Sequence, residues 1–113
     1  MTKDIDTEIV EWSMQAFPDL TMEKQLVKLS HEFRELIEAI ISKNENNILE
    51  EFADVYIVSC ILKKRFNDSV GGYFLGILKD VNVYDIKKAV KEKMEKNRKR
   101  RWTKLNDGTY QHK

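Results

Sequence analysis

Two pairs of acidic residues have the spacing that a metal site built on helices would need. Glu32 and Glu35 form one pair, and Glu51 and Asp54 form the other, with three residues from the first acid to the second in each pair. Residues three apart lie on the same side of an α-helix. If the two pairs converge, four negative charges cannot all stay ionised without a cation. Carboxylate oxygens favour Mg²⁺, with Mn²⁺ as a substitute, over zinc, which prefers His and Cys.

Asp54 is the acid that a solvent-exposed helix face explains least well. It lies in the run ILEEFADVYIVSCIL, residues 48–62, whose apolar side chains surround the predicted helix on every side after Glu51. A helix that is apolar all round is buried, and a buried carboxylate needs a cation, a hydrogen-bond donor or a proton. Glu51 lies in the first helical turn, where the helix dipole favours an acid. Glu50 is predicted to complete a capping box with Asn47.

The first acidic pair lies on a helix with a clear apolar stripe. Glu32 borders this stripe, whereas Glu35 points roughly 160° away from its centre. By itself Glu35 would face solvent, as most acidic residues do. It joins a metal site only if that second face also packs against a helix, of the same subunit or of another one. The stripe consists of Leu26, Leu29, Phe33, Leu36, Ile37 and Ile40.

A basic segment near the C-terminus offers the charge that would complement a phosphate-bearing substrate. Lys93, Asn97 and Arg100 are spaced as i, i+4 and i+7, which places them on one face of a predicted helix. Mg²⁺ usually completes its coordination with water and substrate phosphates, so these three side chains could bind phosphates that the metal also holds. The alternative is a solvated basic helix end, which the helix dipole stabilises.

The elements that carry these residues are predicted to be helices. Periodic apolar residues and cap signals indicate helices at 5–16, 22–43, 48–66 and 83–101, with Thr21, Asn47 and Asn82 as N-caps. Residues 71–81 are predicted as a short helix or an irregular connection, and residues 103–113 as an irregular tail. No stretch has the alternating pattern of a strand. We therefore expect one all-α domain over residues 1–113, a bundle of about four main helices.

Composition excludes several classes of protein. The formal net charge is +1, so the molecule as a whole has no strong attraction to nucleic acid or to a membrane surface. The single Cys60 cannot form an intrachain disulfide and is expected to be a buried thiol in a reducing compartment. No segment reaches the roughly 18 apolar residues of a membrane span, and the N-terminus lacks a signal-peptide pattern. A cytoplasmic location is expected.

Taken in order, these segments resemble the all-α nucleoside triphosphate pyrophosphatase superfamily, which includes MazG-like enzymes, dimeric dUTPases and dCTP pyrophosphatases. HEFRELIEAI followed by EEFADVYIV is similar to the paired ExxE and ExxD helices, and KMEKNRKRRW to the Lys-x-x-x-Asn-x-x-Arg segment. WSMQAFPDLT resembles the aromatic segment before the first metal helix. The ending W-x-x-x-x-D-G-x-x-x-H is most similar to small MazG-like dATP/dGTP diphosphohydrolases.

The resemblance implies a helical bundle assembled as a homodimer or homotetramer, and hydrolysis between the α and β phosphates of a nucleoside triphosphate in nucleotide-pool control. One of the four clustered acids would orient or deprotonate the attacking water. Trp12 and Phe17 would form the base or sugar pocket, although either ring could instead belong to the core. In one departure from the pattern, His31 replaces an acid that many relatives carry next to Glu32. The implied site residues are Glu32, Glu35, Glu51 and Asp54 for catalysis and Mg²⁺, and Lys93, Asn97 and Arg100 for phosphate.

Two alternatives remain open at this stage. The first is a non-catalytic helical regulator that binds nucleic acid through residues 87–101, where nine Lys and Arg residues accumulate. No stacking aromatic interrupts that basic run before Trp102, which argues against single-strand binding. The second alternative is a degenerate homologue that binds nucleotides without hydrolysing them.

Overall fold

In the computed structural model, described for residues 3–81, 83–100, 102–104 and 110–112, four helices pack around a central fifth one. The first two begin at the predicted residues, and the second has its predicted N-cap, Thr21. Helix α1 spans Ile5–Ala16, and Asp4 caps it by accepting a hydrogen bond from the Thr7 backbone N–H at 2.7 Å. Helix α2 spans Met22–Ser42, and Thr21 accepts from the Lys24 N–H at 3.3 Å. The predicted bounds of both helices are confirmed to within one residue.

Helix α3 begins earlier than the sequence suggested. It spans Glu45–Phe66, and its N-cap is Asn44, whose side chain accepts from the Asn47 N–H at 3.2 Å. The predicted capping box of Asn47 and Glu50 is therefore wrong. Asn44 is the N-cap because Lys43 adopts the left-handed conformation that ends α2. The chain turns there, and the next helix begins within two residues. Glu50 lies beyond the first turn of α3, so it does not take part in capping the helix.

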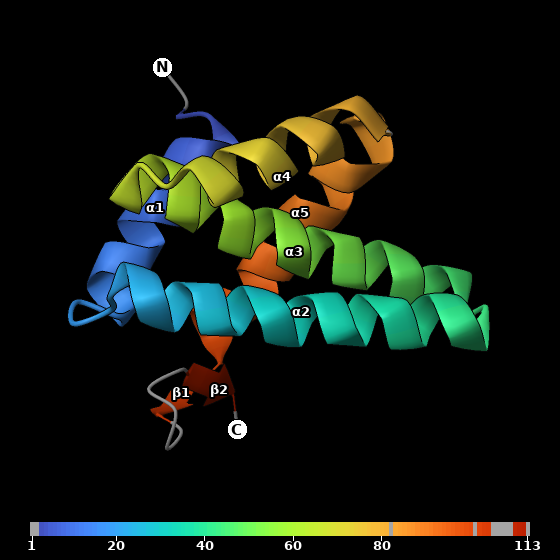
Figure 1. Ribbon diagram of the computed structural model, residues 1–113, viewed down its shortest axis with the longest axis horizontal. Coiled ribbons are helices and arrows are strands. Elements are labelled where there is room, and N and C mark those ends of the chain that lie inside the picture. Colours follow the sequence, from blue (N-terminus) through green and yellow to red (C-terminus); the bar gives the residue numbers. More distant parts are fainter. Residues whose placement is uncertain (1–2, 82, 101, 105–109, 113) are drawn as a thin grey trace.

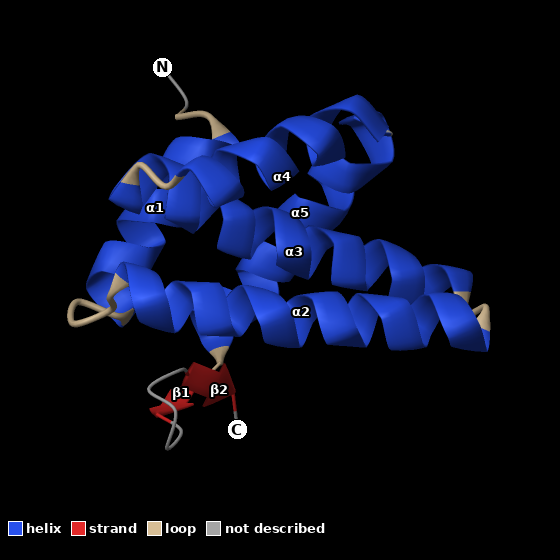
Figure 2. Cartoon of the chain, viewed as in Figure 1, coloured by secondary structure: helices blue, strands red, loops and turns tan. Residues whose placement is uncertain are grey.

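The remaining chain departs from the prediction in two places. Residues 71–81 belong to a complete helix, α4, which spans Ser69–Val81, so the bundle has five helices instead of four. Helix α5 spans Val83–Lys99, and the predicted cap Asn82 lies outside the described residues. The tail predicted to be irregular contains two short antiparallel strands, β1 (Trp102–Lys104) and β2 (Tyr110–His112). They lie at one edge of the molecule, beyond the end of α5 (Figure 2).

Helix α3 is the centre of the bundle. It packs against α1, α2, α4 and α5, and Figure 1 shows it lying between α2 and α4 with α5 passing behind it. Its residues Val55–Leu62 are all buried, which confirms that the apolar run is enclosed on every side. Cys60 is buried within it as a free thiol, as expected. Among the described helices, none has the length and apolar composition that crossing a bilayer requires.

The link between α1 and α2 is held in place by Arg65 of α3. Its guanidinium donates to the backbone oxygens of Ser13 at 2.9 Å and Phe17 at 3.0 Å. Carbonyls at the end of a helix have no partner within the helix, so this arginine satisfies them from a neighbouring element. The contact fixes the aromatic residues Trp12 and Phe17 relative to α3.

Candidate functional site

The antiparallel packing of α2 on α3 brings the two acidic pairs together. Each of Glu32, Glu35, Glu51 and Asp54 offers a carboxylate oxygen, and these four oxygens all lie within 4.8 Å of one another. Such a group could hold a metal ion. The spacing on each helix was readable from the sequence, but the meeting of the two helices at this level is a result of the fold.

Glu35 reaches the cluster because α2 packs with a different face from the predicted one. The predicted stripe included Ile37 and Ile40, yet these side chains are 55% and 49% exposed, whereas Gln25 and Glu32 are buried. The face of α2 that packs against α3 is therefore rotated from the predicted stripe toward Glu32 and Glu35, because α3 covers the edge of the stripe on which Glu32 lies. Glu35 remains exposed as a residue while its carboxylate lies at the edge of the cluster.

Two buried oxygens in the cluster have the chemistry that a cation ligand needs. Glu32 Oε2 and Glu51 Oε2 have no hydrogen-bond partner among the described residues. Burial and the nearby carboxylate of Asp54 raise the pKa of Glu32 to about 7 and the pKa of Glu51 to about 8. Buried carboxylate oxygens without partners are costly, and a hard divalent ion is the ligand that an all-oxygen donor set accepts best.

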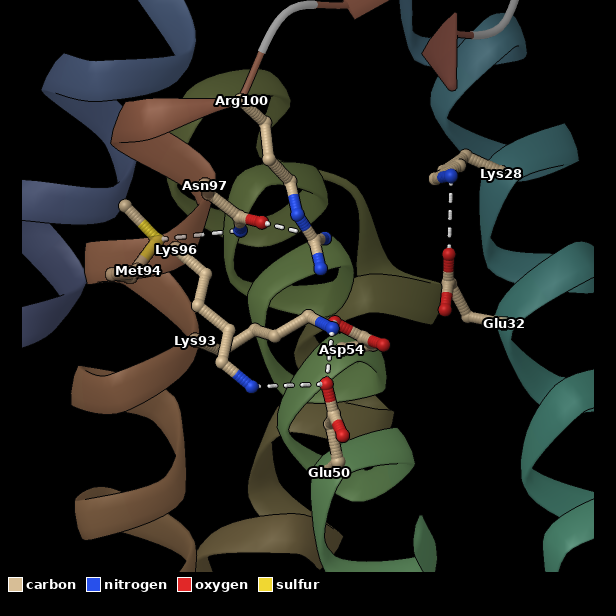
Figure 3. A network of polar contacts seen from close by, with 9 residues as sticks. All are labelled: Lys28, Glu32, Glu50, Asp54, Lys93, Met94, Lys96, Asn97 and Arg100. Carbon is tan, nitrogen blue, oxygen red and sulfur yellow. Dashed lines mark hydrogen bonds and ion pairs between the residues drawn. The ribbon is translucent and has the colours of Figure 1, made fainter. Parts of the chain in front are cut away.

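The largely buried carboxylate of Asp54 forms an ion pair with the ammonium group of Lys93. Its Oδ1 lies 3.4 Å from Nζ of Lys93, which belongs to α5 (Figure 3). Burial raises the pKa of Asp54, and the ammonium of Lys93 opposes that rise. Desolvation disfavours the charge on Lys93, but Asp54 and Glu50 outweigh it and raise the pKa of Lys93.

Glu50 is the acid that the sequence assigned to a cap and that the structure assigns to this network. Its Oε1 accepts a hydrogen bond from Lys93 Nζ at 2.8 Å and lies 3.6 Å from Nζ of Lys96 (Figure 3). The hydrogen bond from Lys93 lowers the pKa of Glu50, despite some burial, so this carboxylate stays ionised near neutral pH.

The other two phosphate-binding candidates share the face of α5 that carries Lys93. Asn97 is buried, and its Oδ1 accepts from Nη1 of Arg100 at 3.5 Å. In Figure 3 Lys93 and Arg100 reach from α5 toward the side on which Lys28 and Glu32 of α2 lie. The predicted one-face arrangement of the three α5 residues is therefore confirmed, and their role in binding phosphate stays a prediction.

A cavity of about 360 Å³ joins these groups to an aromatic end. Trp12 and Phe17 line it, as predicted, and their ring centroids are 5.3 Å apart. Phe17 is only 6% exposed, so it is part of the core as well as of the cavity wall. Trp102 of β1 completes this end, with its ring centroid 5.2 Å from that of Phe17.

Three further residues that line the cavity were not predicted from the sequence as site residues. Lys28 lies one turn before Glu32 and pairs with its Oε1 at 3.1 Å, a contact that the four-residue spacing could have suggested. His31, the departure from the family pattern, also lines the cavity. Trp102 belongs to the C-terminal ending that carries the resemblance, but its place in the cavity was not predicted, because only the fold brings β1 beside Trp12 and Phe17. Comparisons with protein-family models, with curated proteins and with solved structures give no match for this chain.

Proposed function

We propose that this protein is a Mg²⁺-dependent nucleoside triphosphate pyrophosphatase, which hydrolyses the bond between the α and β phosphates to give a monophosphate and pyrophosphate. The observation that carries this proposal is the convergence of four carboxylates, within 4.8 Å, in the same cavity as Lys93, Asn97 and Arg100. One end of the cavity can hold a cation with phosphates, and the other presents aromatic rings for a base or sugar. The segments resembling MazG-like enzymes support the same activity.

Each group has a role in the proposed reaction. Glu32, Glu35, Glu51 and Asp54 would hold Mg²⁺, or Mn²⁺ in its place, and the ion supplies positive charge for phosphate oxygens and for the attacking water. One carboxylate of this set orients the water or takes its proton. Lys93, Asn97 and Arg100 neutralise the triphosphate by charge and hydrogen bonding. Trp12 provides a stacking surface, and Phe17 supports it from the core.

The chain is proposed to act as a homodimer or homotetramer on deoxynucleotides, in control of the nucleotide pool. The assembly is supported by the apolar side chains that α2 leaves uncovered, since Ile37 and Ile41 are 55% and 73% exposed. Large exposed apolar groups gathered on one helix are typical of a surface that another protein covers. The family resemblance implies the same states.

A screen of common deoxynucleoside and ribonucleoside triphosphates for pyrophosphate release tests the activity. We expect Mg²⁺-dependent release from at least one of them, and loss of at least about 100-fold in rate for Glu51→Gln and for Asp54→Asn. Glu38→Gln is the matched control, because Glu38 pairs with Arg34 on the surface and lies outside the cavity. Absence of turnover with every nucleotide would rule out the enzyme, and Mg²⁺-dependent binding without turnover would identify a degenerate homologue.

The outer face of α5 supports a second candidate function, a non-catalytic regulator that binds nucleic acid. Lys87, Lys88, Lys91 and Lys99 are all exposed there. Such binding would weaken steeply with salt, because each lysine that neutralises a phosphate releases counterions. It would also be unaffected by Asp54→Asn. Salt-sensitive binding to DNA or RNA that persists in that variant, together with no nucleotide hydrolysis, would favour this candidate.

A further inference from the structure

Glu50 is a fifth acid of the cavity, and neither the four-carboxylate cluster nor the helix cap accounts for it. It lines the cavity from α3, one turn before Asp54. Among the contacts of its carboxylate are two ammonium groups of α5, Lys93 Nζ at 2.8 Å and Lys96 Nζ at 3.6 Å. The shorter contact is a charge-assisted hydrogen bond, the stronger kind. Glu50 is therefore placed to hold Lys93 and not to join the acid cluster.

Lys93 lies between two carboxylates that have different roles in the proposed reaction. Its Nζ is 3.4 Å from Oδ1 of Asp54, which is one of the proposed metal ligands, and 2.8 Å from Glu50, which is not. A cation bound by Asp54 would repel the ammonium from that side. Lysine has a flexible four-carbon side chain, so without a second anchor Lys93 could then leave the cavity wall.

We propose that Glu50 is a positioning residue that keeps Lys93 directed at the phosphates of the nucleotide while Asp54 binds the metal. The inference rests on the proposed function. It follows from the spacing of Glu50 and Asp54, four residues apart on α3, which lets both carboxylates reach the same ammonium of α5 (Figure 3). Lys93 is buried, with its side chain 9% exposed, so its position matters more than that of a surface lysine.

A double-mutant cycle tests this role. Glu50→Gln, Lys93→Met and the double variant are compared with the unchanged protein in two measurements. One is the steady-state kinetics of pyrophosphate release from the best deoxynucleotide. The other is calorimetric binding of inorganic pyrophosphate in the presence of Mg²⁺, which needs no turnover. Thermal melting of each variant checks that it is folded.

We expect Glu50→Gln to raise KM and the Kd for pyrophosphate by about 10-fold, with a smaller change in kcat. Lys93→Met should have a similar or larger effect, and adding Glu50→Gln to it should change little further, because Glu50 acts through Lys93. Lys96→Met is the matched control. Lys96 contacts the same carboxylate at 3.6 Å, but its side chain is 58% exposed and outside the cavity, so KM should stay near that of the unchanged protein.

Two results would overturn the inference while leaving the activity intact. Glu50→Gln could behave like the unchanged protein, or it could weaken pyrophosphate binding by the same factor with and without Lys93, which would mean that Glu50 does not act through Lys93. An unchanged protein that neither hydrolyses a nucleotide nor binds pyrophosphate with Mg²⁺ would overturn the proposed function, and this inference with it.

Discussion

Glu32 and Glu51 each bury a carboxylate oxygen that has no hydrogen-bond partner among the described residues. These two groups make the stability of the folded protein depend on pH. The pKa of a carboxyl group in an unfolded chain is near 4.5, whereas the folded protein raises the pKa of Glu32 to about 7 and that of Glu51 to about 8. The folded state therefore holds protons that the unfolded state releases. Stability from these groups is complete below about pH 4.5 and is lost as the pH rises toward 8.

Mg²⁺ should reverse this loss, because it binds the ionised carboxylates of the folded state. We expect millimolar Mg²⁺ to raise the melting temperature more at about pH 8.5 than at about pH 6, where protons compete for the same oxygens. The measurement is thermal unfolding with and without Mg²⁺ at both pH values. Glu51→Gln should reduce the Mg²⁺-dependent shift and make the metal-free protein more stable at the higher pH. An equal shift at both pH values would argue against metal binding by these carboxylates.

At the scale of elements, the position of α4 depends on a close approach to α3. A Cβ atom added at Gly71 would collide with Leu62 Cβ and lie 2.8 Å from the Lys63 backbone N and 2.9 Å from the Ser59 carbonyl oxygen. The backbone of α3 cannot move away without disturbing the buried segment that carries the second acidic pair. Glycine is thus required at this crossing by the packing of the two helices.

Gly71→Ala should therefore destabilise the protein by about 1–3 kcal/mol, through overpacking. The same substitution at Gly76, also in α4, is the matched control, because a Cβ there meets nothing within 4 Å. Gly76→Ala should stabilise by about 0.5–1 kcal/mol, since alanine loses less backbone entropy in a helix. Urea unfolding measures both free energies. A Gly71→Ala variant as stable as the unchanged protein would show that helix α4 does not approach α3 as described.

At the scale of the whole molecule, apolar side chains are left on the surface of two helices that touch each other. Phe33 of α2 and Phe74 of α4 have ring centroids 4.7 Å apart. On the same two helices, Ile37 and Tyr73 are 55% and 67% exposed. If the proposed homodimer or homotetramer forms, this surface is the part of the described chain best suited to be covered.

Charged substitutions on that surface should dissociate the assembly. We expect the unchanged protein to have two or four times the mass of one chain. Ile37→Lys combined with Ile41→Lys should shift that mass to the monomer, because a lysine buried in an apolar interface loses its hydration. Light scattering coupled to size-exclusion chromatography measures the mass. Met14→Lys is the control, since Met14 is 55% exposed but lies on α1. A monomeric unchanged protein would contradict the proposed assembly.

The sequence by itself determined the helices and the spacing of the chemistry. Caps such as Thr21 and the apolar run around Asp54 are local signals, so the bounds of α1 and α2 and the burial of α3 could be predicted. The two acidic pairs and the Lys93, Asn97 and Arg100 face follow from helical periodicity in the same way. Residues 71–81, part of helix α4, were predicted only as a short helix or an irregular connection, since their apolar run is interrupted by glycines and has no clear period.

Only the tertiary structure decided which of these groups meet. The rotation of α2 about its axis, which brings Glu35 to the cluster, depends on how α3 covers α2. The apolar stripe of α2 is wider than the surface that α3 covers, so the stripe alone cannot specify this rotation. Glu50 was assigned to a cap because its partner Lys93 is 43 residues away in the chain. Trp102 lines the aromatic end of the cavity because the fold brings β1 beside Trp12 and Phe17. Contacts between residues distant in sequence have no periodicity to reveal them, so the fold alone selects them.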